Sequence, residues 1–181
     1  YLFFMNDHDV SIPTAESYFS NIEIYEDSAS ANNEPPTVTT STTTLEYTEN
    51  DAATVVDAGV TVTDADDVTL ASASVSITGN FVAGEEQLSF TDTTLIQGTL
   101  SGGGQTVKLS AQAGQSPTVA DFQAALRLVT YVNLSEDPST ALRTVSFTAD
   151  DGQAVGSATR AVNVIAVNDA PSVTTTSTTL D

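Results

Sequence analysis

The sequence predicts an all-β protein: a sandwich of two packed antiparallel sheets with one short helix. The 181-residue chain contains 29 threonines, and Thr and Val side chains favour the pleated surface of a sheet. Apolar and polar residues alternate in several short segments, as in strands with one face in the core. Turn-forming Gly and Asn residues separate these segments. Together these features favour two packed sheets.

The alternation is clearest where Ala71, Ala73, Val75 and Ile77 interleave with Ser and Thr residues. Such a segment has one face directed toward the core and one face directed toward solvent. About eight segments share this strand character. They lie at residues 37–47, 55–63, 71–78, 88–90, 107–111, 129–133, 142–149 and 158–167.

One segment departs from strand periodicity and predicts a helix over residues 118–127. Thr118 is a suitable N-cap, with Asp121 three residues later. Phe122, Leu126 and Val129 follow at helical spacing. We expect this helix to cover an open end or edge of the sandwich with its apolar stripe.

A duplication marks the domain boundaries. Residues 33–46 reappear at residues 168–181, an offset of 135, with eight of the 14 aligned pairs identical. A period of this length indicates tandem domains, because solenoid units are shorter, roughly 20–50 residues. We therefore expect residues 1–34 to be the closing hairpin of an upstream β-domain plus a linker, 35–169 to be one complete repeat, and 170–181 to open the next repeat.

Charge and composition exclude several classes of function. The formal net charge is −20 and the isoelectric point about 4.1, so nucleic-acid phosphates and anionic lipids are not expected partners. We also expect no membrane insertion, because no apolar run approaches the roughly 20 residues that a span requires. The chain has no Cys and a single His, which argues against thiolate sites, His-rich zinc sites and Ser-His-Asp catalysis.

The strand directions implied by the alternation gather acidic residues at the two ends of the sandwich. Residues 55–63 and 142–149 should run toward the end where the repeat begins, and residues 37–47 and 158–167 away from it. Near the beginning of the repeat, the expected group is Asn33, Glu34, Asp64, Asp66, Asp67, Asp150 and Asp151. At the opposite end, the expected group is Glu49, Asp51, Glu136, Asp137, Asn168 and Asp169.

Carboxylates brought close together repel one another unless a cation lies between them. Ca²⁺ is the natural candidate, because it takes six to eight oxygen ligands from carboxylates, amides and carbonyls in irregular loop geometry. Any one of these acids could equally be a solvated surface charge that keeps the protein soluble. A cation held at a linker would contact two successive domains and stiffen the hinge between them.

These residues carry a family resemblance over about 135 residues. The segment VNDAP at 167–171 resembles the linker of bacterial cadherin-like domains, which occur in tandem in large secreted adhesins. Asp64-Ala65-Asp66 resembles the cadherin Asp-x-Asp calcium motif. The segments 119–131, 143–147 and 150–152 are similar to that family and to the related chondroitin-sulfate-proteoglycan repeats.

The resemblance implies a Greek-key, cadherin- or immunoglobulin-like sandwich with calcium at the domain junctions. It also implies an extracellular or cell-surface array that projects a binding domain. It assigns Glu49 to the acid that ends the first strand, Asp64 and Asp66 to the Asp-x-Asp role, and Asn168 and Asp169 to the linker. The linker lacks further acids of the full cadherin motif, so fewer or weaker ions per junction are expected.

The leading interpretation is a structural and adhesive spacer without enzymatic activity, whose partners are adjacent repeats of the same chain. One alternative is carbohydrate recognition by the upstream fragment, where Asn6, Asp7, Asp9 and Tyr18 are available to bind cell-surface glycans. Another is a filament of many copies, in which the opening strand at 174–180 completes a neighbouring sandwich. Catalysis would depend on paired carboxylates such as Glu85-Glu86, which we expect instead to lie in a solvated turn.

Overall fold

The structure is a computed structural model that describes residues 33–171. These residues form an all-β sandwich with one short α-helix and one 3-10 turn. The elements are β1 (Thr37–Thr39), β2 (Leu45–Thr48), β3 (Thr54–Val55), β4 (Thr61–Thr63), β5 (Ser72–Gly79), β6 (Glu86–Ser89), β7 (Ile96–Ser101), η1 (Gly102–Gly104), β8 (Thr106–Ala111), α1 (Val119–Leu126), β9 (Thr130–Asn133), β10 (Arg143–Asp150) and β11 (Val155–Ile165).

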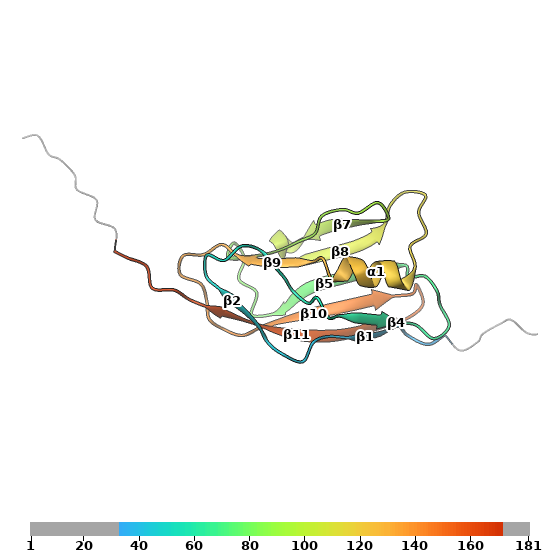
Figure 1. Ribbon diagram of the computed structural model, residues 1–181, viewed down its shortest axis with the longest axis horizontal. Coiled ribbons are helices and arrows are strands. Elements are labelled where there is room, and N and C mark those ends of the chain that lie inside the picture. Colours follow the sequence, from blue (N-terminus) through green and yellow to red (C-terminus); the bar gives the residue numbers. More distant parts are fainter. Residues whose placement is uncertain (1–32, 172–181) are drawn as a thin grey trace, which may run out of the picture. The chain divides into compact units, whose positions relative to one another are not determined.

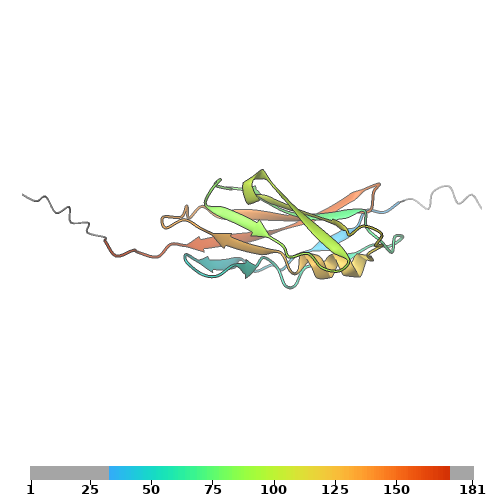
Figure 2. The same cartoon turned by 90° about the horizontal axis from the view of Figure 1, so that it is seen from above.

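The sandwich has one large sheet and a composite second layer (Figures 1 and 2). The large sheet has six strands in the order β2-β11-β10-β5-β8-β7. The second layer contains the pair β1-β4, the three-stranded sheet β3-β9-β6 and the helix α1. The inward side chains of both layers form one hydrophobic core. The long strands β5 and β10 pair along almost their whole length and form the centre of the large sheet.

The alternation in the sequence places the core as expected. Ala73, Val75 and Ile77 of β5 are buried, whereas the Ser residues between them are only partly covered. Ser74 and Thr148 form a hydrogen bond of 2.7 Å across the outer face of the β5-β10 pair. Ser76 and Thr106 form a similar bond of 2.9 Å, so cross-strand Ser and Thr pairs satisfy polar groups on this face of the sheet.

The helix predicted over residues 118–127 is confirmed. α1 spans Val119–Leu126, with Thr118 at the N-cap. The Thr118 hydroxyl accepts a hydrogen bond from the Asp121 amide, and the Asp121 carboxylate accepts one from the Thr118 amide, forming a capping box. Phe122 and Leu126 are buried in the core.

The single strand predicted over residues 37–47 is wrong in one respect, because this segment changes sheets. β1 pairs with β4, whereas β2 pairs with β11 in parallel, a departure from the all-antiparallel expectation. The crossover is fixed at Ser41, whose amide and hydroxyl both donate to the buried carboxylate of Asp57 over 2.7 Å. Asp57 also accepts a hydrogen bond from the Gly59 amide and lies 3.3 Å from Arg160 Nη1.

Strand β7 was not predicted, and it forms one edge of the large sheet. Its residues are mostly exposed beyond Ile96, so the strand shows no clear alternation. Two of its amides are capped by side chains of the preceding turn. Gly98 donates to Asp92 Oδ1 over 2.8 Å and Ile96 donates to Thr93 Oγ1 over 3.0 Å. These caps disfavour pairing of another strand along this edge.

The two ends of the described chain emerge at opposite ends of the sandwich (Figure 1). We call the end at residue 33 the N-terminal pole and the end at residue 171 the C-terminal pole. β4 and β10 run toward the N-terminal pole, and β11 and β2 run toward the C-terminal pole. The directions expected from the sequence for these strands are therefore correct. The single strand expected over residues 55–63 is wrong, however, because this segment divides into β3, which pairs with β9, and β4, which pairs with β1.

Some predictions fall outside the described residues. They concern the hairpin expected within residues 1–34, of which residues 1–32 are not described, the glycan-binding candidates Asn6, Asp7, Asp9 and Tyr18, and the strand at 174–180. In residues 33–171, no helix has the length and apolar character needed to cross a bilayer.

Candidate functional site

Each pole of the sandwich carries one tight group of three carboxylates. Within residues 33–171, carboxylate oxygens lie within 4.8 Å of one another in two groups. The C-terminal cluster contains Glu49, Glu136 and Asp169, and the N-terminal cluster contains Asp64, Asp66 and Asp67. All six residues were among the candidates from the sequence.

The C-terminal cluster is centred on Glu49, which follows β2 directly. Its amide donates to the carbonyl of Ile165 over 2.9 Å, continuing the parallel pairing with β11. Its Oε2 accepts a hydrogen bond of 2.7 Å from the Val167 amide. The residue is only 3% exposed, and its other oxygen, Oε1, is buried without a hydrogen-bond partner. A buried carboxylate oxygen without a partner carries a large desolvation cost, which a bound cation would offset.

The other two carboxylates of this cluster reach it from different segments. Glu136 belongs to the loop between β9 and β10, and Asp169 belongs to the chain leaving β11. Both residues are exposed, so solvent ions can reach the cluster. Three oxygen-bearing acids from three separate segments form a donor set suited to a hard divalent cation such as Ca²⁺.

The N-terminal cluster comes from a single loop after β4. Asp64 Oδ1 accepts hydrogen bonds from the amides of Asp66 and Asp67, over 3.1 and 2.9 Å, which folds the loop around it. Asp64 Oδ2 is shielded from solvent and has no hydrogen-bond partner. The Asp66 carboxylate accepts the amide of Glu34 at 3.3 Å, so the incoming linker is attached to this cluster.

The surroundings of this cluster disfavour the charged form of Asp67. Loss of hydration and the nearby charges of Asp66, Asp64 and Asp151 all raise the pKa of Asp67 above its ordinary value of 3.8. Loss of hydration and the neighbouring carboxylates both disfavour the ionised form of this carboxyl group, which a nearby cation would stabilise.

The acids at the turn from β10 to β11, Asp150 and Asp151, lie outside the tight group of three carboxylates and accept hydrogen bonds from nearby backbone amides. Asp151 Oδ1 accepts hydrogen bonds from the amides of Gln153 and Ala154, and these bonds lower its pKa. Its Oδ2 accepts a hydrogen bond of 3.0 Å from Asn33 Nδ2, and Asp150 Oδ1 accepts one from the Gly152 amide. Asp150 and Asp151 therefore shape the turn and attach the linker, and neither belongs to the three-carboxylate group.

The remaining candidates at the C-terminal pole also lie outside the tight group. The Asp51 amide donates to Thr48 and the Asp137 amide to Ser135 Oγ, over 3.0 and 3.1 Å. Asn168 Nδ2 donates to the carbonyl of Asp169. These contacts involve main-chain groups of turns rather than converging carboxylates. At the N-terminal pole, the Glu34 amide donates a hydrogen bond to the Asp66 carboxylate, whereas the Glu34 side chain is exposed.

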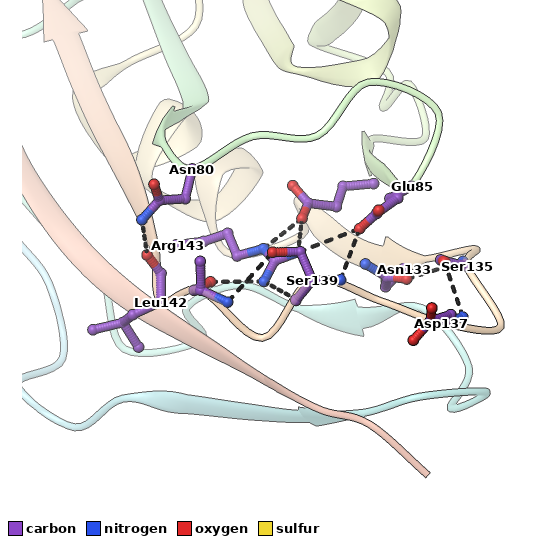
Figure 3. Close-up of polar contacts among 10 residues, drawn as sticks. Asn80, Glu85, Asn133, Ser135, Asp137, Ser139, Leu142 and Arg143 are labelled. Carbon is purple, nitrogen blue, oxygen red and sulfur yellow. Dashed lines mark hydrogen bonds and ion pairs between the residues drawn. The ribbon is translucent and has the colours of Figure 1, made fainter. Parts of the chain in front are cut away.

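A buried ion pair near the C-terminal pole was not expected from the sequence (Figure 3). Glu86 is 2% exposed and pairs with Arg143, which is fully buried. The expectation of a solvated turn at Glu85-Glu86 is thus wrong for Glu86. Burial raises the pKa of Glu86, and the adjacent guanidinium opposes this effect. Burial, reinforced by the charge of Glu86, also raises the pKa of Tyr131 to about 12.

Comparisons of the chain with protein-family models, with curated proteins and with solved structures find no match. The functional interpretation therefore depends on the residues and their geometry.

Proposed function

We propose that residues 33–171 form a non-enzymatic repeat of an extracellular, cell-surface adhesin, with Ca²⁺ stiffening its junctions to neighbouring repeats. The observation that carries this proposal is the carboxylate of Glu49. It is buried at the C-terminal pole, leaves one oxygen without a partner and meets Glu136 and the linker residue Asp169. The resemblance to bacterial cadherin-like repeats points to the same function.

The duplication makes each linker common to two repeats. Asn168 and Asp169 correspond to Asn33 and Glu34 at the offset of 135. In this repeat, Asn33 bonds Asp151, and the Glu34 amide bonds Asp66, both at the N-terminal pole. By that correspondence, residues 168 and 169 would attach to the N-terminal pole of the next repeat while Asp169 faces Glu49 and Glu136. A cation among these three carboxylates would then fix the linker to the preceding repeat.

Two of the three cluster members, Glu136 and Asp169, lie on connections outside the sheet, which gives the cation its proposed mechanical effect. Without a cation, Asp169 is repelled by Glu49 and Glu136, so the linker is free to leave the pole. With a cation, the same charges hold the linker against β2 and β11. The calcium concentration would thereby set the stiffness of the array.

Thermal unfolding of the 181-residue chain in calcium and in chelator tests cation binding. A ligand that binds only the native state stabilises it by RT ln(1 + [L]/Kd). A higher melting temperature in calcium supports the proposal, and identical curves contradict it.

A test of whether calcium stiffens the junction requires two consecutive repeats. A chain in which a second copy of residues 35–169 follows Asp169 should scatter X-rays as a rigid rod in calcium and as a flexible pair in chelator. Equal flexibility in both conditions would contradict stiffening while leaving cation binding intact.

A further inference from the structure

The loop that carries Glu136 is held by a network of polar contacts that includes Glu85, Ser139 and Arg143 (Figure 3). This loop joins β9, which ends at Asn133, to β10, which begins at Arg143. At its start, the Leu134 amide donates to the carbonyl of Glu85 over 2.6 Å, and the Ser135 amide donates to Asn133 Oδ1 over 3.0 Å. The beginning of the loop is therefore fixed to the strand end.

The middle of the loop is held at Ser139, three residues after Glu136. The Ser139 amide donates to Glu85 Oε2 over 3.1 Å. The Ser139 carbonyl accepts a hydrogen bond from Arg143 Nη1, which also donates to the carbonyl of Ala141 over 2.6 Å. Both polar groups of the Ser139 backbone are thus occupied by charged side chains, and charged hydrogen bonds are stronger than neutral ones.

The guanidinium of Arg143 is in turn oriented by Glu86, which accepts from Nε and pairs with Nη2. A buried ion pair is weak evidence for stability, because desolvation opposes the attraction of the charges. The planar guanidinium fork of arginine is, however, well suited to fixing the direction of its hydrogen bonds. Here, one edge of the fork faces Glu86 and Nη1 faces the loop carbonyls, so the loop is connected through Arg143 to the start of β6.

We propose that Arg143 and Glu85 are positioning residues that hold Glu136 at the C-terminal cluster and thereby set the calcium affinity of that pole. This inference rests on the proposed function, because it presupposes that the cluster binds Ca²⁺. Neither residue contacts the cation; each acts through the backbone of Ser139. Residues that orient metal ligands typically change metal affinity roughly 10- to 100-fold when replaced.

The test is a calcium titration of the full chain followed by residue-specific amide NMR. The Val167 amide, which donates to Glu49 Oε2, reports the C-terminal cluster, and the Asp67 amide, which donates to Asp64 Oδ1, reports the N-terminal cluster. Arg143→Lys keeps the charge beside Glu86 but removes the fork. Glu85→Ala removes the acceptor of the Ser139 amide, whereas Glu85→Gln restores an oxygen acceptor without restoring the charge. Asp92→Ala removes a carboxylate outside both clusters and serves as the control.

Glu85→Ala and Arg143→Lys should each raise the half-saturating calcium concentration at Val167 roughly tenfold and leave the value at Asp67 unchanged. Glu85→Gln should recover most of the lost affinity, and the control should match the wild type. In a Glu136→Gln background, neither substitution should weaken binding at Val167 further, because the ligand being positioned is already lost.

Three results would contradict the positioning role of Arg143 and Glu85 without contradicting the proposed function. These are an unchanged calcium affinity at Val167, equal losses of affinity in Glu85→Ala and Glu85→Gln, or a loss that persists in the Glu136→Gln background. If Arg143→Lys fails to fold, the Glu85 pair decides the outcome, because the Glu85 side chain is partly exposed. A wild-type Val167 amide that does not respond to calcium would instead contradict the proposed function, and with it this inference.

Discussion

The two poles of the sandwich contain the same number of clustered carboxylates but assemble them differently. At the N-terminal pole, Asp64, Asp66 and Asp67 belong to one loop that is folded by its own hydrogen bonds, and none of the three is fully buried. At the C-terminal pole, Glu49, Glu136 and Asp169 come from three separate segments, and Glu49 is buried. The first cluster is a local property of the chain, whereas the second exists only in the folded domain.

This difference assigns different tasks to the poles. A partly exposed group of charges is screened by water and salt more than a buried one, so a cation at the N-terminal pole should have the smaller effect on stability. A cation beside Glu49 would offset the desolvation of a buried carboxylate and would tie the outgoing linker to the fold. We therefore expect the C-terminal pole to dominate the calcium response of the repeat.

The largest effect is expected from Glu49→Gln. The wild type at a calcium concentration 100 times Kd should gain about 2.7 kcal/mol, which corresponds to a rise on the order of 5–10 °C in melting temperature. Glu49→Gln should lose most of this gain, because the buried charge that attracts the cation is gone. In chelator, the variant should melt at or above the wild type, because a neutral amide is less costly to bury than an unpaired carboxylate.

Differential scanning calorimetry with calcium and with chelator measures both values. Glu46→Gln is the matched control, since Glu46 lies on β2, the strand that leads into Glu49, is exposed and accepts a hydrogen bond from Asn163. A full calcium response in Glu49→Gln would place the cation elsewhere.

The next effect concerns the incoming linker at the N-terminal pole. A Cβ added to Gly156 would lie 2.7 Å from the carbonyl carbon of Pro36, so Gly156→Ala should push the linker off β11. The cost of such overpacking is about 1–3 kcal/mol. Urea unfolding in chelator measures it, with the exposed neighbour substitution Ser157→Ala as control. Unchanged stability would mean that this linker is not seated on the strand.

A smaller effect is expected from the double substitution Asp64→Asn and Asp66→Asn. Asparagine retains the side-chain oxygen that accepts the loop amides, so the loop should stay folded. Calcium-dependent stability should fall by on the order of 1 kcal/mol or less, because no member of this cluster is fully buried and solvent screens its charges. In the NMR titration, the Asp67 amide should lose its response while Val167 keeps it; loss at both amides would show that the poles are not independent.

The smallest effect is a pH dependence at the N-terminal pole. The pKa of Asp67 is raised in the native state, so the native state binds this proton more tightly than the unfolded chain. Asp67 therefore lowers stability progressively as the pH rises from its ordinary pKa of 3.8 through the raised value. Asp67→Asn should remove this slope in chelator, and calcium should reduce it in the wild type. Unfolding curves across this acidic range would detect it, and an unchanged slope in the variant would refute it.

Local patterns in the sequence were sufficient for much of the fold. Thr118 and Asp121 identify the helix start because a capping box depends only on residues three apart. The Thr-rich segment 37–47 has no useful period, and its division into two strands depends on Asp57, 16 positions from Ser41. Edge strand β7 escaped prediction because exposure removes the alternation on which strand assignment depends.

The sequence was sufficient to predict the pole at which each acidic residue lies, but not the groups that its side chain contacts. Strand direction correctly placed Glu49, Glu136 and Asp169 at one end. It could not show that Asp150 and Asp151 turn their carboxylates toward backbone amides, because loop side-chain directions follow from tertiary contacts. The burial of Glu86 depends on Arg143, 57 positions away, and no local pattern contains that information.

The most direct measurement is X-ray diffraction from crystals of this chain grown in calcium, with anomalous scattering used to locate the ion. The proposal predicts an anomalous peak among Glu49, Glu136 and Asp169, with Glu49 Oε1 as one of its ligands. A well-ordered C-terminal pole without such a peak, with these three side chains directed apart into solvent, would contradict it.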